Sequence, residues 1–149
     1  MDPFIGLIEA LAEYEHLAPP DADARQRLAH DAVASPPRFS ALLAELDGQP
    51  VGYAAFLETY STFLALPTLY LEDLFVLPDF RGSGVGSALF RECAAEAVRR
   101  GCGRMEWQVL AWNDLALGFY QHLGATALHD DWLCYRLAGD ALERFGHLQ

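Results

Sequence analysis

Lysine is absent from this chain of 149 residues, so all ten of its basic residues are arginine. Acidic residues number 21, which gives a formal net charge of −11 at pH 7. A surface this acidic repels the phosphate backbone of nucleic acids, and we expect no nucleic-acid partner. A negative field raises the local concentration of a cationic substrate. Acidity also promotes solubility, and composition alone leaves both interpretations open.

Cysteines and long apolar runs are also scarce. The three cysteines, Cys93, Cys102 and Cys134, are too few and too odd in number for a disulfide scaffold. No apolar run reaches the roughly 18 residues that a membrane helix needs, and no signal peptide is visible. No histidines and cysteines cluster with the spacing of metal ligands. We therefore expect a cytoplasmic protein without membrane association or bound metal, folded as one domain over residues 1–149.

A glycine-rich turn between two apolar segments is the most informative feature of the chain. Residues 69–76 form an apolar run typical of a strand, and residues 87–100 form an amphipathic stretch typical of a helix. The turn between them carries Gly82, Gly84 and Gly86. Converging N–H groups and the positive partial charge of a helix start bind anions, and glycine lets a ligand approach the backbone. This pattern predicts a phosphate or pyrophosphate site.

Three kinds of phosphate loop compete for this pattern. A Walker loop needs a lysine after its second glycine, but here Ser87 follows Gly86 and the chain has no lysine. A dinucleotide fingerprint needs the spacing G-x-G-x-x-G, whereas these glycines are spaced G-x-G-x-G. The remaining pattern, Arg81-x-x-Gly84-x-Gly86, resembles the R/Q-x-x-G-x-G/A signature of the GNAT acetyltransferases. Those enzymes hold the pyrophosphate of acetyl-coenzyme A on this loop.

The resemblance extends in order over nearly the whole chain. It is strongest to one GNAT branch, the diamine (spermidine/spermine and thialysine) N-acetyltransferases. The matching segments are LAEYE (11–15) for the first helix, YLEDLFVLP (70–78) for the strand before the loop, GCGRMEW (101–107) and VLAWN (109–113) for the next strand, FYQHLGA (119–125) for a helix end and YRL (135–137) for the last strand. The resemblance implies an α/β (α+β) GNAT fold, with a mixed, mostly antiparallel central sheet flanked by helices.

Periodicity and turn residues predict where the elements lie. We expect helices at 2–16, 21–33, 87–100 and 114–124; strands at 39–46, 51–57, 69–77 and 104–110; a last strand pair at 125–128 and 132–137; and a loop with exposed aromatic residues at 58–67. GNAT chains usually open with a strand, but here Met1 lies almost at the helix start. The strand that usually precedes the first helix is therefore expected to be missing. Either the chain is shortened, or the start of the sequence is assigned at the wrong position. Residues 39–46 would then form an exposed edge.

Acetyl transfer to an amine requires a neutral amine, a polarised thioester and a stabilised thiolate. An alkyl ammonium has a pKa near 10, so a base or a water relay must take its proton at neutral pH. In the resembling enzymes a glutamate on the strand before the loop takes or relays this proton, and Glu72 occupies that position. Asp73 would point to the opposite face of a regular strand. Family enzymes carry a bulge there that can re-aim side chains, so both acids could contribute, with Glu72 favoured.

The resemblance implies roles for further residues. Tyr120 matches the family tyrosine that bonds the coenzyme sulfur, and a phenol there can protonate the thiolate. Asn113 is expected to cap its helix and contact the coenzyme. Tyr14 and Glu15 are candidates on the acceptor side, although an exposed helix end explains them equally well. The expected coenzyme-binding residues are Leu74, Phe75, Val76, Arg81, Gly82, Ser83, Gly84, Val85, Gly86, Ser87, Asn113 and Tyr120.

The resemblance implies an acetyl-CoA-dependent N-acetyltransferase. It would move an acetyl group by direct transfer to the primary amine of a small cationic acceptor, such as a diamine or polyamine. The resemblance also implies a homodimer. A protein or peptide N-acetyltransferase and a non-catalytic coenzyme A sensor or structural subunit are the alternatives. The presence of both Glu72 and Tyr120 favours an enzyme, because a pure binding protein needs neither residue.

Overall fold

The computed structural model describes residues 2–128 and 134–146. The chain divides into two compact units, Met1–Gln108 and Val109–Gln149. No helix among the described residues is long and apolar enough to cross a bilayer.

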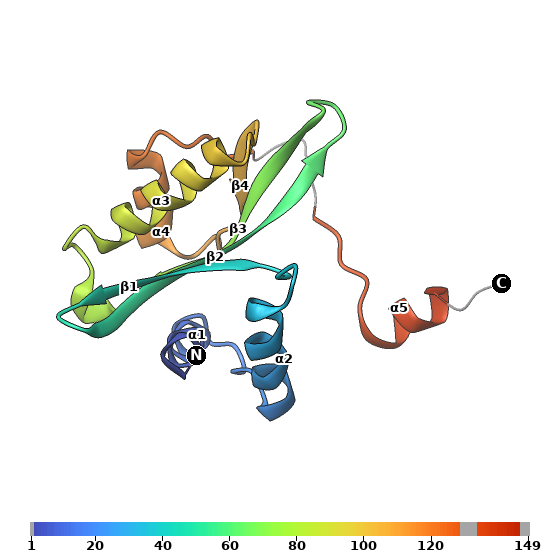
Figure 1. The fold of residues 1–149 in the computed structure, drawn as a ribbon, viewed down its shortest axis with the longest axis horizontal. Helices are drawn as coiled ribbons and strands as arrows, with labels where there is room; N and C mark the ends of the chain where they lie inside the picture. The colour runs from blue at the N-terminus through green and yellow to red at the C-terminus, as the bar shows by residue number, and fades with distance from the viewer. Residues whose placement is uncertain (1, 129–133, 147–149) are drawn as a thin grey trace. The chain divides into compact units, whose positions relative to one another are not determined.

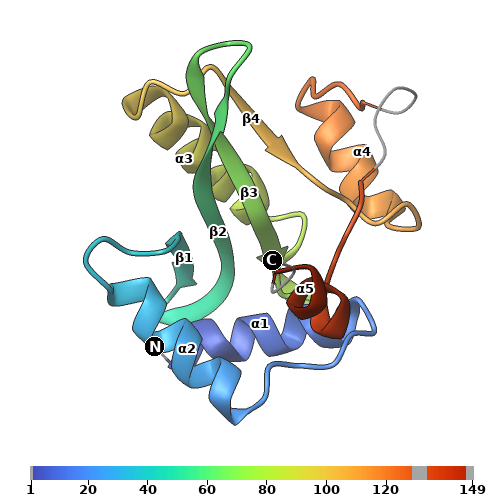
Figure 2. The same cartoon turned by 90° about the vertical axis from the view of Figure 1, so that its right-hand side faces the viewer.

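A four-stranded sheet forms the centre of the first unit (Figure 2). Its strands are β1 (Ser40–Leu46), β2 (Gln49–Ser61), β3 (Leu66–Val76) and β4 (Arg104–Trp107), in the order β1-β2-β3-β4. The first three are antiparallel, whereas β4 is parallel to β3. The chain crosses between these two through helix α3 (Val85–Arg99), because parallel neighbours need a long connection. The predicted mixed, mostly antiparallel sheet is confirmed, and β1 lies at one edge of it, as expected.

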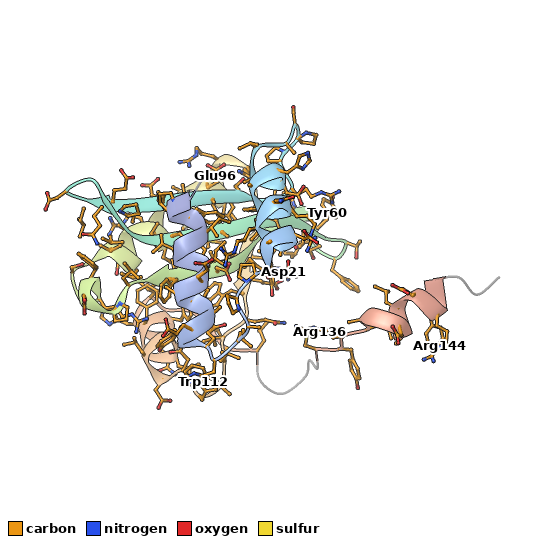
Figure 3. The ribbon with its side chains drawn as sticks, turned by 90° about the horizontal axis from the view of Figure 1, so that it is seen from below. Asp21, Tyr60, Glu96, Trp112, Arg136 and Arg144 are labelled. Carbon is orange, nitrogen blue, oxygen red and sulfur yellow. The ribbon has the colours of Figure 1, made fainter. Side chains whose placement is uncertain are left out.

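Helices cover both faces of this sheet. α3 lies on one face, and α1 (Asp2–Tyr14) and α2 (Ala22–Val33) lie on the other (Figure 1). Asp21 caps α2 by accepting a hydrogen bond from the backbone N–H of Ala24 at 2.8 Å (Figure 3). The core on the α3 face contains Val51, Ala54, Phe56, Leu69, Leu71, Val76, Val85, Leu89, Cys93 and Ala97. The core on the α1 face contains Phe4, Leu7, Tyr53, Ala55 and Phe75.

A β-bulge interrupts β3 at Glu72. Ala55 of β2 is opposite Asp73 and the next residue, Phe56, is opposite Leu71, so Glu72 has no cross-strand partner. The extra residue reverses the alternation of side chains along β3. Leu71 therefore belongs to the core on the α3 face, whereas Asp73 is hydrogen-bonded to Tyr53 on the α1 face. The bulge that the resemblance implied is present where it can re-aim the two acids.

The β2–β3 hairpin is longer than the sequence predicts. Residues 58–61 and 66–67, expected in a loop, are paired strand, and only 62–65 form the turn. Cross-strand pairing satisfies the backbone whatever the polarity of the side chains, and the local pattern does not show this. The side chains of Tyr60, labelled in Figure 3, and of Phe63 are exposed, as predicted.

The second unit differs most from expectation. It contains α4 (Asp114–His122), which the sequence predicts, and α5 (Gly139–Gly146), which it does not. The strand predicted at 104–110 ends at Trp107. Residues 125–128 and 134–137 are not strands, so the described parts of the predicted last pair are wrong; residues 129–133 lie outside the described residues. A strand needs a partner strand for its backbone groups, and the described part of this unit has no sheet.

Candidate active site

The glycine-rich loop leaves the first turn of α3 open. After β3 the chain makes a 3₁₀ turn, η1 (Pro78–Phe80), and then passes through Gly82 and Gly84, whose φ angles are +74° and +91°. Gly84 is the N-cap of α3 and has no side chain to bond the first-turn N–H groups. A Cβ built on either glycine would meet no atom within 4 Å. The donors at this helix start are therefore accessible to an anion.

Arg81 connects this loop to the end of α1. Its Nε donates a hydrogen bond to the carbonyl oxygen of Val76 at 2.9 Å. Its guanidinium carbon lies 4.5 Å from the ring centroid of Tyr14 and 5.6 Å from that of Phe75, within cation–π range. The Ser83 hydroxyl also donates to the carbonyl oxygen of Phe80, at 2.6 Å. The arginine of the signature thus holds the loop in place, and Tyr14 lies beside the loop.

The edge of β3 is unpaired beyond the bulge. Pairing between β3 and β4 ends where Leu71 is opposite Trp107. Within Met1–Gln108, residues 72–76 therefore have no strand neighbour on that side. An unpaired edge offers backbone N–H and C=O groups to an extended ligand, as in β-strand addition.

Three acids gather where β3 approaches the end of α1. Asp73 accepts a hydrogen bond from the Tyr53 hydroxyl at 3.1 Å. The pKa of Asp73 is raised to about 6, chiefly by burial. The hydrogen bond from Tyr53 opposes this rise, whereas the negative charges of Glu72 and Glu15 add to it. Burial also raises the pKa of Glu15. Glu72, the bulge residue, is exposed. A group of neighbouring carboxylates like this one suits a cation.

Tyr53 is the part of this cluster that sequence reasoning missed. The residue has no exposed surface, and burial, followed by the charge of Asp73, raises the pKa of its phenol. The available signal was a tyrosine in the otherwise apolar run 51–56, because a buried phenol requires a hydrogen-bond partner. The sequence did not indicate that Asp73 was the partner.

The raised pKa of Asp73 predicts that Asp73→Asn stabilises the fold at neutral pH. The folded-state pKa of about 6 exceeds the ordinary 3.8, so stability from this group is present below about pH 4 and lost as pH rises through 6. Asparagine still accepts the Tyr53 bond but carries no charge. We expect the free energy of unfolding to rise by about 3 kcal/mol at pH 8 and to change little near pH 4. Urea unfolding at both pH values measures this, and an equal gain at both would contradict it.

The second unit carries the other two predicted site residues. The Asn113 side chain accepts a hydrogen bond from the backbone N–H of Ala116 at 3.2 Å, which confirms it as the cap of α4. Tyr120 lies on the same helix, half-buried, and its ring packs edge-on against that of Phe119 with centroids 5.3 Å apart. Both residues are therefore held by one short, capped helix.

The predicted residues of the first unit come together at one end of β3. The bulge strand, the glycine loop, the start of α3 and the end of α1 meet there through the contacts of Arg81, Tyr14 and Phe75. Among the residues that the structure describes, no three His, Cys, Asp or Glu side chains form a group able to hold a metal. The arrangement combines a helix start without a side-chain cap, an open strand edge and a cluster of acids.

Comparison with known proteins connects this arrangement to a family. The model of the Acetyltransferase (GNAT) family matches residues 6–125. The chain is 36% identical over 146 residues to a thialysine N-epsilon-acetyltransferase of Bos taurus, covering 91% of this chain and 85% of that protein. It is 40% identical over 97 residues to an L-ornithine N5-acetyltransferase of Arabidopsis thaliana, covering 65% of this chain and 42% of that protein.

A solved structure shows the same fold. It is an integron cassette protein from the mobile metagenome of V. cholerae, with a TM-score of 0.82 and 24% identity, and the match covers 98% of this chain and 91% of that one. The family match spans both units of the chain, and the thialysine N-epsilon-acetyltransferase matches it over nearly its full length. This chain therefore belongs to the GNAT family of acetyltransferases.

Proposed function

We propose that this enzyme transfers the acetyl group of acetyl-coenzyme A directly to the primary amine of a small cationic acceptor such as a diamine or polyamine. The observation that carries the proposal is the group of acids, Glu15, Glu72 and Asp73, beside the glycine loop. The names of the thialysine and ornithine acetyltransferases support a small amine acceptor. A net charge of −11 favours capture of a cation.

The coenzyme would bind along the glycine loop and the open edge of β3. The GNAT family uses acetyl-CoA. First-turn N–H groups of α3 suit the pyrophosphate, with Gly82 and Gly84 leaving space for close approach. The unpaired backbone of residues 72–76 suits the amide-containing pantetheine arm. In our proposal Leu74, Phe75, Val76 and residues 81–87 contribute to this binding, together with Asn113 and Tyr120 from α4.

The chemistry would proceed by direct attack. The acceptor arrives as an ammonium ion near Asp73 and Glu15 and loses a proton to Glu72, directly or through water. The neutral nitrogen attacks the thioester carbonyl, the C–N bond forms and the C–S bond breaks. The leaving thiolate takes a proton from Tyr120, and the resulting phenolate regains a proton from solvent. Glu72 releases its first proton to water and then accepts the surplus proton of the amide nitrogen. In these roles carboxylates face the positive ammonium ion and a phenol faces the negative thiolate.

The two compact units would work as one acetyltransferase domain. The family match runs from residue 6 to residue 125, through the boundary between the units. We further propose that the protein is cytoplasmic and that it forms the homodimer that the resemblance implies. Size-exclusion chromatography with light scattering measures the oligomeric state.

The acceptor and the role of Glu72 can be tested together. We expect kcat/KM for diamines to rise with pH in the wild type, because the free amine becomes more abundant. Glu72→Gln should lower kcat/KM most near neutrality, and the difference should narrow at high pH where the amine is already neutral. Added salt should weaken capture of polyamines more than of monoamines, since charge attraction is screened. A thiol-release assay with diamines, polyamines, amino acids and peptides measures all three effects.

A matched variant separates local chemistry from overall charge. Glu45→Gln removes the same charge at an exposed position of β1 and should leave the pH profile unchanged. Equal acetylation of neutral or acidic acceptors would contradict the proposed acceptor. Preferred acetylation of peptides would favour the protein acetyltransferase, and coenzyme binding without turnover would favour the non-catalytic sensor.

A further inference from the structure

We infer that Tyr53 is a positioning residue that holds the Asp73 carboxylate in the acceptor site, keeps it ionised and thereby sets the lower pH limit of acetylation. The inference rests on the proposed function, because it gives Asp73 the task of holding the acceptor ammonium. The roles proposed for the glycine loop, for Glu72 as the base and for Tyr120 as the thiolate donor do not explain why the phenol of Tyr53 is buried here.

The Tyr53 ring is held firmly. It lies on β2 opposite Phe75 of β3, and its residue has no exposed surface. The edge of the Phe4 ring packs against it with centroids 5.2 Å apart, and the Phe75 ring lies 6.4 Å away. A ring packed by α1 on one side and β3 on the other presents its hydroxyl in a single direction. That hydroxyl donates to Asp73 Oδ2 at 3.1 Å.

The bulge at Glu72 orients Asp73 toward the Tyr53 hydroxyl. In a regular strand, with Leu71, Glu72 and Asp73 each paired in turn, Asp73 would share a face with Leu71 and point into the apolar core against α3. The bulge turns Asp73 to the α1 face, where the Tyr53 hydroxyl meets it. Phenylalanine would fill the same space in the core, so packing alone does not explain the hydroxyl. A buried hydroxyl is tolerated because it has this acceptor.

The charges around Asp73 explain why the bond matters. Glu72 on the same strand and Glu15 at the end of α1 both oppose ionisation of Asp73, and burial opposes it further. The bond from Tyr53 on β2 favours the ionised form. Arg81, from the loop, has its guanidinium over the rings of Tyr14 and Phe75. With a pKa of about 6, Asp73 is charged at neutral pH and becomes neutral just below it, where it no longer attracts an ammonium ion.

The test is the pH profile of kcat/KM for a diamine in a Tyr53→Phe variant. The change keeps the packed ring and removes the bond that favours ionised Asp73. We expect the acid limb to move upward by about half to one pH unit, the equivalent of one hydrogen bond. On that limb kcat/KM should fall about three- to ten-fold, whereas at pH 8.5 it should stay within about two-fold. Acetyl-CoA affinity, measured by calorimetry, should not change.

Two comparisons make the result specific. Tyr60→Phe removes an exposed hydroxyl from the same strand and should leave the limb in place. In an Asp73→Asn background, Tyr53→Phe should cause no further movement of the limb, because the two changes act through one bond. A carbon-13 NMR titration of the Asp73 carboxyl in wild type and Tyr53→Phe should show the same upward shift without any acceptor present.

The outcomes separate the two proposals. A folded Tyr53→Phe enzyme with an unmoved acid limb, or with an equal loss of kcat/KM at every pH, would overturn the role of Tyr53. An unmoved Asp73 titration in that variant would overturn it as well. A wild-type enzyme that acetylates no cationic amine would instead contradict the proposed function, and the carboxyl titration would still report whether Tyr53 controls Asp73.

Discussion

Tyr120→Phe is expected to lower kcat by about 100-fold or more, the usual contribution of a general acid. Acetyl-CoA affinity should stay nearly intact. The phenol is proposed to donate to a thiolate that forms only late in the reaction, so its loss should affect the transition state rather than coenzyme binding. The packing of the Tyr120 ring against Phe119 is retained by phenylalanine, and α4 should keep its cap at Asn113. Steady-state kinetics over a range of pH, with calorimetry for the coenzyme, measures both effects.

A matched control for this change lies in the same unit. Tyr135 is 86% exposed, so Tyr135→Phe removes a hydroxyl without altering a packed ring. That variant should retain wild-type turnover. If Tyr120→Phe also stayed within about two-fold of wild type at every pH, far short of a general acid's contribution, the tyrosine would have only a structural role.

Gly84→Val is expected to weaken acetyl-CoA binding by about ten- to a hundred-fold. Loss of one charge-assisted hydrogen bond between a backbone N–H and a pyrophosphate oxygen is of this size. The added side chain would occupy the open space in front of the first turn of α3, where no protein atom lies within 4 Å of the new Cβ. The variant also carries backbone strain, because the φ angle of Gly84 is +91°. Calorimetry on the folded variant measures the affinity.

Gly48 provides the control for that strain. It lies in the β1–β2 turn with a φ angle of +77°, and a Cβ there also meets no atom within 4 Å. Gly48→Val should therefore lose similar stability but bind acetyl-CoA as the wild type does. Unchanged affinity in folded Gly84→Val, or an equal loss in Gly48→Val, would show that the coenzyme does not bind close to this backbone.

The sequence alone determined the features that depend on neighbouring residues. The glycine loop, the capped start of α4 at Asn113, the Asp-Gly turn at 47–48 and the apolar stripe of α3 are each written in a few consecutive positions. Local rules of capping, turn geometry and helical periodicity are enough to find such features. They predicted the four strands of the sheet and the helices α1 to α4; the anion site at the start of α3 stays a prediction.

Only the tertiary structure decided the features that join distant parts of the chain. The length of the β2–β3 hairpin depends on pairing between strands. In the described parts of the predicted last strand pair, residues 125–128 and 134–137, no strand forms, because a strand signal does not supply a partner. The contact of Arg81 with Tyr14 joins residues 67 positions apart. The face to which Asp73 points depends on one extra residue in the register of two strands, and its bond to Tyr53 depends on that face. Such long-range contacts have no local signature, because they exist only once the backbone has folded and the side chains have packed.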